Sequence, residues 1–217
     1  MRLHRKRSRT ELAKREGGRL PKQVDHDQRR AQIADALQRL IARHGLEGVS
    51  LRHVAAEAGV SMGSVQHYFA SKDEMLLFTL EHRNRQREER IRAQVIAGGE
   101  RTPKRILRAC LLEMLPRDER SAADWLIGVA FFTRAVADAR LAEVYAEGVP
   151  QLHEFFAGLI RQAQEAGDVA ADVDAGHESA ILWALADSQG SDVLLGHRSA
   201  DDAVATVDYH LGRLFTR

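Results

Sequence analysis

The sequence predicts an all-α protein, and three observations support that prediction. Apolar residues recur at helical spacing along the chain, and no segment alternates apolar and polar residues as a half-buried strand does. Ser, Thr and Asp residues stand before most of the periodic segments, where they can cap the first turn of a helix. Glycines stand where several segments end, and 44% of the 217 residues are hydrophobic, which is enough for a sizeable core.

Residues 1–24 form a basic segment that we expect to be a disordered tail. It contains nine Lys or Arg against Glu11 and Glu16, whereas the whole chain has a net charge of only +1. The segment has few apolar residues to bury, which is typical of disorder. Such a tail is either an arm that binds a nucleic-acid backbone through counterion release or an extension without a role.

The first predicted helix runs from about Asp27 to His44. Asp25 can cap its start, and Gly45 ends it. Its apolar residues fall on one face, which we expect to point inward. They are Ile33, Leu37, Leu40 and Ile41.

Residues 49–76 indicate two short helices joined by a sharp turn and followed at once by a longer helix. Gly59 stands at the turn, where a residue without Cβ can adopt a positive φ. Ser61 then caps the second short helix, whose Val65 and Phe69 we expect to point to the core. The inward face of the first short helix carries Leu51, Val54, Ala55 and Ala58. This pattern predicts a helix-turn-helix, a motif that reads DNA.

The longer helix is predicted from Lys72 to about Ala97. Ser71 and Glu74 have the spacing of a capping box at its start, and a Gly-Gly pair follows its end. Residues 81–90 are almost entirely charged or polar. A solvated face explains this run better than a second nucleic-acid contact.

These motifs resemble the TetR family of transcriptional regulators, most strongly over residues 26–80. The resemblance rests on the Ala-Ala-x-Ala-Gly-Val turn at 55–60, on His67-Tyr68-Phe69, and on Ser71-Lys72-Asp73-Glu74. It implies a three-helix DNA-binding domain over residues 25–72. It also implies a helical effector-binding and dimerisation domain over residues 73–217. In that second domain the resemblance is architectural and leans towards the branch that responds to quaternary ammonium compounds.

The second short helix is the expected recognition helix, and its N-terminal half should enter the major groove. The predicted base-contacting residues are Met62, Gly63, Ser64, Gln66 and His67. The Gln66 amide can pair with adenine, and it stands where the family usually has a tyrosine, which favours base reading over phosphate anchoring. The predicted backbone-contacting residues are Ser50, Arg52, Ser61, Tyr68 and Lys72. For Ser50 and Ser61, helix capping alone explains the residue type equally well.

The remainder of the chain predicts helices over about 103–115, 121–139, 140–166, 174–196 and 199–216. Thr102-Pro103, Ser121 and Ser199 provide the expected starts. Pro150 lies inside the third of these segments. An interior proline removes a backbone hydrogen bond, so we expect that helix to be kinked, or divided near Gly148.

The last two predicted helices carry apolar stripes that suggest a homodimer interface. A short link makes them antiparallel neighbours, and doubling such a pair gives a four-helix bundle. The predicted interface residues are Ile181, Leu185, Ser188, Val204, Val207, Leu211 and Leu214. The alternative is that these stripes close a monomeric core. A two-fold protein would suit a palindromic operator.

Aromatic residues of the second domain can line a pocket for a small-molecule effector. The predicted pocket residues are Trp125, Phe131, Phe132, Tyr145, Phe156, Trp183 and Asp187. Core packing is the alternative for each single ring. Asp187 can either attract a cationic ligand or contribute to the dimer contact.

Other functional classes find little support in the sequence. No apolar run is long enough for a membrane span, and no signal peptide is evident, so we expect a cytosolic protein. The single cysteine, Cys110, lies among leucines and predicts a buried, inert thiol. Scattered histidines, with no nucleophile elbow or phosphate loop, indicate no metal site, cofactor or catalysis.

The sequence therefore predicts a ligand-responsive repressor that binds a palindromic double-stranded operator as a homodimer. A small molecule bound in the helical domain would release it from the DNA. Two alternatives remain at this point. One is an architectural DNA-binding protein without an effector, and the other is a helical enzyme or carrier with a vestigial helix-turn-helix.

Overall fold

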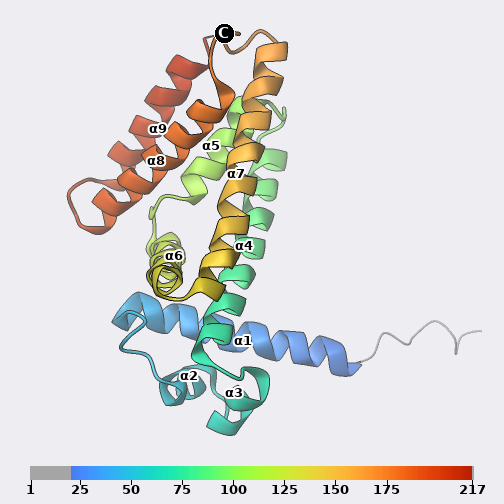
Figure 1. Ribbon diagram of the computed structural model, residues 1–217, viewed down its shortest axis with the longest axis vertical. Helices are drawn as coiled ribbons and strands as arrows, with labels where there is room; N and C mark the ends of the chain where they lie inside the picture. The colour runs from blue at the N-terminus through green and yellow to red at the C-terminus, as the bar shows by residue number, and fades with distance from the viewer. Residues whose placement is uncertain (1–20, 217) are drawn as a thin grey trace, which may run out of the picture.

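The computed structural model describes residues 21–216, with the side chains of residues 21–25, 145 and 147 left aside. Over this range the chain consists of helices without strands (Figure 1), which confirms the all-α prediction. The helices are α1 (Pro21–His44), α2 (Leu51–Ala58), α3 (Met62–Tyr68), α4 (Lys72–Ala97), α5 (Pro103–Glu113), α6 (Glu119–Ala137), α7 (Ala139–Glu165), α8 (Ala175–Leu194) and α9 (Ala200–Leu214). Of the predicted tail, residues 1–20 lie outside the described residues, and residues 21–24 belong to α1.

Two predicted helix boundaries need correction. Helix α1 begins at Pro21 and not near Asp27. Helix α6 begins at Glu119, because Asp118 is its N-cap. The Asp118 side chain accepts a hydrogen bond from the Ser121 backbone N at 2.7 Å, so Ser121 completes a capping box and does not start the helix.

Helix α7 is one continuous helix through Pro150. Since proline has no backbone N–H, the carbonyl of Ala146 loses its usual helical partner. Both Ala146 and Pro150 are exposed, so water can satisfy that carbonyl. The helix is therefore not divided near Gly148.

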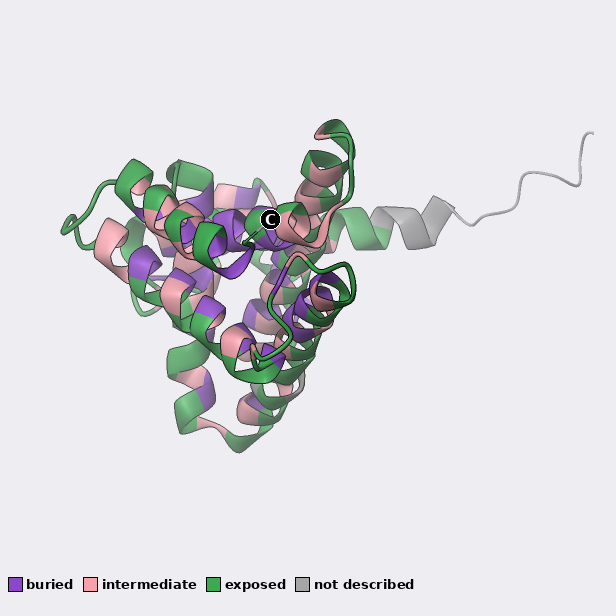
Figure 2. Cartoon of the chain, turned by 90° about the horizontal axis from the view of Figure 1, so that it is seen from above, coloured by how far each residue is buried: buried purple, intermediate pink, exposed green. Residues whose placement is uncertain are grey.

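Two hydrophobic cores stabilise the fold. The DNA-side core joins α1–α3, the start of α4 and α6, and its members include Ile33, Val54, Val65, Met75 and Ile127. The distal core joins α5, α7, α8 and α9, and its members include Leu107, Phe156, Leu182, Val207 and Leu211. In Figure 1 the helix-turn-helix lies at the lower end of the molecule and the α8–α9 pair lies at the upper end. Figure 2 shows exposed residues on the outward faces of the helices that enclose these cores.

A charged layer lies among α4, α5 and α6 and corrects the expectation that residues 81–90 form only a solvated face. Arg83 is 6% exposed, and it donates from Nη1 to the backbone oxygen of Asp124 at 2.6 Å. The carboxylates of Glu113 and Asp124 are also buried. Among the described residues, no helix is long and apolar enough to cross a membrane.

Candidate DNA-binding surface and helical-domain sites

The turn between α2 and α3 is fixed by backbone geometry at Gly59. This residue has a φ of 65°, in the left-handed region that favours glycine. The N–H of Gly59 donates to the Ala56 oxygen at 3.2 Å, and the N–H of Val60 donates to the Ala55 oxygen at 3.0 Å. These two bonds close the C-terminus of α2 and direct the chain into α3.

Helix α3 presents one face to the core and the other to solvent. Val65 is fully buried and Phe69 is 2% exposed, which anchors the helix. Ser61 caps it by accepting a hydrogen bond from the Ser64 backbone N at 3.0 Å. The residues left exposed are Met62, Gly63, Gln66 and His67. Of the five predicted base-contacting residues, only Ser64 is half-buried, and the other four are accessible.

The predicted phosphate-contacting residues are in more varied positions. Ser50 caps α2 in a capping box with His53, a partner that the sequence analysis did not identify. Lys72 folds back and donates to the Leu46 carbonyl oxygen at 2.8 Å, so a phosphate contact would have to replace that bond. Arg52 is exposed, whereas Tyr68 is half-buried with its ring edge-on to His26.

Arg30 is a structural residue of this surface that sequence reasoning missed. Its guanidinium lies 4.8 Å from the ring centre of Phe69 and 4.3 Å from that of Phe78, and it donates to Glu74 at 3.2 Å. Glu74 in turn accepts a hydrogen bond from the Ala70 backbone N at 2.8 Å. The predicted capping box is thus only half formed, because the Glu74 carboxylate binds Ala70 and not Ser71. The contacts of Arg30 with Phe69, Phe78 and Glu74 could not be predicted from the sequence, because they depend on how α1 packs against α3 and α4.

The aromatic residues expected to line a pocket do not share one environment. Phe131 and Phe156 are at most 1% exposed and pack in the DNA-side and distal cores, so they fill space instead of lining a cavity. Phe132 is 50% exposed on α6, and Asp187 is exposed on α8. Trp125 and Trp183 are half-buried, while the side chain of Tyr145 lies outside the described part of the chain.

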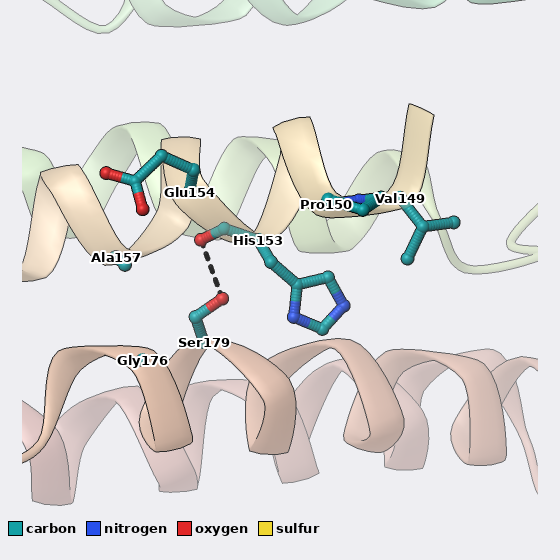
Figure 3. Close-up of a pocket in the computed structure, with 7 residues that line it drawn as sticks. All are labelled: Val149, Pro150, His153, Glu154, Ala157, Gly176 and Ser179. Atoms are coloured by element: carbon teal, nitrogen blue, oxygen red, sulfur yellow. Dashed lines mark hydrogen bonds between the residues drawn. The ribbon is translucent and has the colours of Figure 1, made fainter. Parts of the chain in front are cut away.

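A surface hollow of about 430 Å³ lies between α7 and α8, and none of the predicted pocket residues lines it. Figure 3 shows the His153 ring in this hollow, with the His153 carbonyl oxygen accepting a hydrogen bond from the Ser179 hydroxyl at 2.8 Å. Trp183 lies nearby, with its ring centre 5.9 Å from that of His153. The lining residues are Val149, Pro150, His153, Glu154, Ala157, Gly176 and Ser179.

The predicted dimer residues divide into two groups. Val207, Leu211 and Leu214 are buried in the distal core of the chain itself, which favours the alternative of core packing for these three residues. Leu185 and Val204 pack partly against the same core. Ile181 and Ser188 are exposed on α8. Two further apolar side chains are exposed here, Leu195 at the C-cap of α8 and Tyr209 on α9. Tyr209 was missed because it lies off the main apolar stripe of α9.

A capped, exposed helix that follows a glycine turn and is anchored on a three-helix core defines a helix-turn-helix DNA-binding protein. Residues 33–77 match the family profile "Bacterial regulatory proteins, tetR family", and residues 103–216 match "BetI-type transcriptional repressor, C-terminal". The chain belongs to the TetR family of transcriptional regulators, and it is not an enzyme.

Several known proteins are similar to this chain along most of its length. The regulator PksA of Bacillus subtilis (strain 168) is 34% identical over 77% of this chain and 80% of its own. The regulator BetI of Burkholderia ambifaria is 32% identical over 71% of this chain and 83% of its own.

Solved structures agree with these relatives. A transcriptional regulator from Rhodococcus sp. Rha1 has a TM-score of 0.72 and 29% identity, and the match covers 85% of this chain and 95% of that one. A regulator from Saccharomonospora viridis, solved in complex with choline, has a TM-score of 0.74 and 26% identity over 87% and 98%.

Proposed function

We propose that this protein is a ligand-responsive repressor that binds a palindromic operator as a homodimer. A small molecule bound in the helical domain favours a dimer whose recognition helices are wrongly spaced for two successive major grooves. The operator is then released, and transcription of the regulated gene resumes.

The exposure pattern of α3 carries the DNA-binding part of the proposal. Val65 and Phe69 hold the helix on the core, so its opposite face must point away from the protein. That face carries Gln66 and His67 beside Met62, which is 45% exposed. An amide suits adenine and a thioether suits a thymine methyl, so this face has the chemistry of direct base reading.

The α8–α9 face supports the homodimer. Ile181, Leu195 and Tyr209 are 49%, 69% and 66% exposed, and apolar side chains of this size favour contact with another surface. Small residues separate them on the same face, which allows close helix packing. These are Ala184 and Ser188 on α8, and Ala205 and Gly212 on α9. Sedimentation velocity should give a dimer, and Ile181→Glu combined with Tyr209→Glu should give a folded monomer.

We propose that the effector is a small organic molecule. The Saccharomonospora viridis regulator was solved with choline, and a quaternary ammonium group is bound best by aromatic rings beside a carboxylate. In this chain Asp187 and Glu143 are exposed, so neither provides a buried counter-charge.

DNA selection tests the proposal as a whole. Fragments that the purified protein retains from a random pool should share a palindrome with two half-sites. Retention of fragments without a common sequence would favour the alternative of an architectural protein. The close packing of Phe131 and Phe156 favours this alternative, because an architectural protein needs no effector cavity.

A further inference from the structure

The charged layer among α4, α5 and α6 contains more cationic than anionic groups. Two buried carboxylates, Glu113 at 1% and Asp124 at 2% side-chain exposure, lie at its centre. Five guanidinium groups surround them, namely those of Arg83, Arg87, Arg90, Arg117 and Arg120. Arg120 also approaches Asp118 at 3.7 Å, yet even with that carboxylate the cations remain in excess.

Both central carboxylates already have several partners. The two oxygens of Glu113 accept hydrogen bonds from Arg90 at 2.8 Å and from Gln94 at 2.9 Å. Burial opposes ionisation of Glu113, but its bonds and charge contacts with the arginines leave its pKa below the ordinary value, so it is charged. Asp124 accepts from Arg90 at 2.7 Å, and Gln38 of α1 binds its other oxygen. Neither carboxylate is left to neutralise a further cation.

Arg83 uses neutral acceptors. Its Nη1 binds the backbone oxygen of Asp124, and its Nη2 binds the side-chain oxygen of Asn84 at 2.8 Å. Burial, together with the charge of Arg87, lowers the pKa of Arg83 to about 9. The positive charge at this position is therefore poorly compensated within the fold.

Arg87 has the least compensation of the five. Its Nε is buried and has no hydrogen-bond partner, and among the described residues it forms no ion pair. Burial is the main cause that lowers its pKa. It interacts electrostatically with the carboxylates of Asp124 and Glu113 and with the thiol of Cys110. A buried donor of this kind costs free energy until an acceptor reaches it.

We propose that the charged layer binds an anionic group of the effector, a carboxylate or a phosphate, with Arg87 as its principal ligand. This inference rests on the proposed function, in which a small molecule in the helical domain controls DNA binding. Guanidinium groups form their strongest hydrogen bonds with such planar or tetrahedral oxyanions. A quaternary ammonium group would instead add a cation to an existing excess.

The position of the layer suits an effector site. It lies between the DNA-side core and the distal core, and Asp124 links Arg90 of α4 to Gln38 of α1. An anion bound by Arg87 also attracts Arg120 and weakens the ion pairs of Arg120 with Asp124 and Glu113. The packing of α4 and α6 on α1 then changes, and α1 carries the helix-turn-helix.

Ligands that share one apolar tail and differ in the head group provide the test. The probes are octanoate, octyl phosphate and octyltrimethylammonium, with inorganic phosphate as the smallest anion. The chain has two tryptophans, so a Trp183→Phe protein reports on Trp125, the neighbour of Asp124. We expect octanoate or octyl phosphate to change this fluorescence at concentrations about tenfold or more below those of the cation, and their comparison identifies the preferred oxyanion.

Arg87→Met should weaken binding of the preferred anion by about tenfold or more. Arg92→Met is the matched control, because Arg92 lies on the same helix, is 69% exposed and pairs with Glu88. Circular dichroism confirms folding, and Arg87→Lys, which keeps the charge, should bind more tightly than Arg87→Met. If Arg87→Met does not fold, the head-group comparison in the parent protein determines whether the layer prefers an anion.

Three results would overturn the proposal. They are binding of octyltrimethylammonium as tight as that of both anions, unchanged anion affinity in Arg87→Met, and no binding of any anion, inorganic phosphate included. Operator affinity, measured in the same titrations, separates this inference from the proposed function. An anion that binds without weakening operator affinity supports the anionic site but refutes release of the operator by this ligand. A cation that releases the operator supports release and refutes the anionic site.

Discussion

Arg134 near the end of α6 binds Asp73 in the first turn of α4. Its Nε and Nη2 donate to the Asp73 carboxylate at distances of 2.9–3.1 Å. The first turn of α4 follows the recognition helix directly, so this contact connects the helical domain to the DNA-reading surface. Both side chains are partly exposed, and such a pair contributes little to overall stability. Its importance is that it fixes the position of one helix relative to another.

Loss of the Arg134–Asp73 contact should loosen the start of α4. In Arg134→Met, the backbone amides of residues 73–76 should exchange with deuterium faster than in the parent protein, because the turn loses its contact with α6. Arg140→Met is the control, since Arg140 is 88% exposed on its side chain. Equal exchange in all three proteins would show that the contact does not hold α4.

Gln66 should contribute to sequence choice and not to general DNA affinity. Gln66→Ala should cost about 1–3 kcal/mol on the operator and leave binding to random duplex nearly unchanged, because the amide reads a base edge. Fluorescence anisotropy with both duplexes measures the difference. Equal losses on the two duplexes would refute base reading by Gln66.

Lys72 should behave differently from Gln66. Lys72→Ala should weaken binding to operator and random duplex by similar factors if its ammonium group reaches a phosphate. The same change removes its bond to the Leu46 oxygen and should also lower the free energy of unfolding. A loss of stability without any loss of DNA affinity would assign Lys72 to structure alone.

Ser61 allows capping to be separated from phosphate contact. Ser61→Ala should reduce the free energy of unfolding by about 0.5–2 kcal/mol, because the Ser64 N–H loses its acceptor. Ser61→Asp keeps an N-cap acceptor but adds a negative charge to the surface that we propose faces the DNA. Urea denaturation should therefore show near-parent stability for Ser61→Asp, together with weakened operator binding. Unchanged DNA affinity would place Ser61 away from the phosphates.

Cys110 should be almost unreactive in the folded protein. Burial raises the pKa of its thiol to about 12, although the charge of Arg87 opposes the shift. A raised pKa means that the folded state favours the neutral thiol, so this stabilising contribution is present below the ordinary pKa and is lost as pH rises towards 12. At pH 8, Ellman's reagent should react far faster with urea-unfolded protein than with folded protein. Equal rates would mean that the thiol is accessible.

Local signals predicted the helix-turn-helix well. Gly59, Ser61 and the Val65–Phe69 pair each act within one or two turns of helix, so their neighbours in sequence are also their neighbours in space. The prediction that residues 81–90 are simply solvated was wrong for a related reason. Arg83 and Arg87 interact with Asp124 and other groups of α5 and α6. No local sequence pattern indicates partners that are so distant from α4 in the sequence.

Apolar stripes alone did not separate the core of the chain from the proposed dimer surface. Val207 and Leu211 form the strongest stripe on α9, and that stripe packs inward. Tyr209 lies between them and is 66% exposed. Which of two faces turns inward depends on the packing of α5 and α8 against α9, which the sequence of one helix does not specify.

Footprinting of the selected operator tests the central claim most directly, because it reports which bases the α3 helices contact. With the parent protein, the expected result is two protected major-groove patches related by a two-fold axis and separated by about 10 base pairs or a multiple of that spacing. With Gln66→Ala, protection should weaken at the same symmetric positions in both half-sites. Protection that is uniform along the duplex, or that is unchanged in Gln66→Ala, would contradict operator reading by this helix.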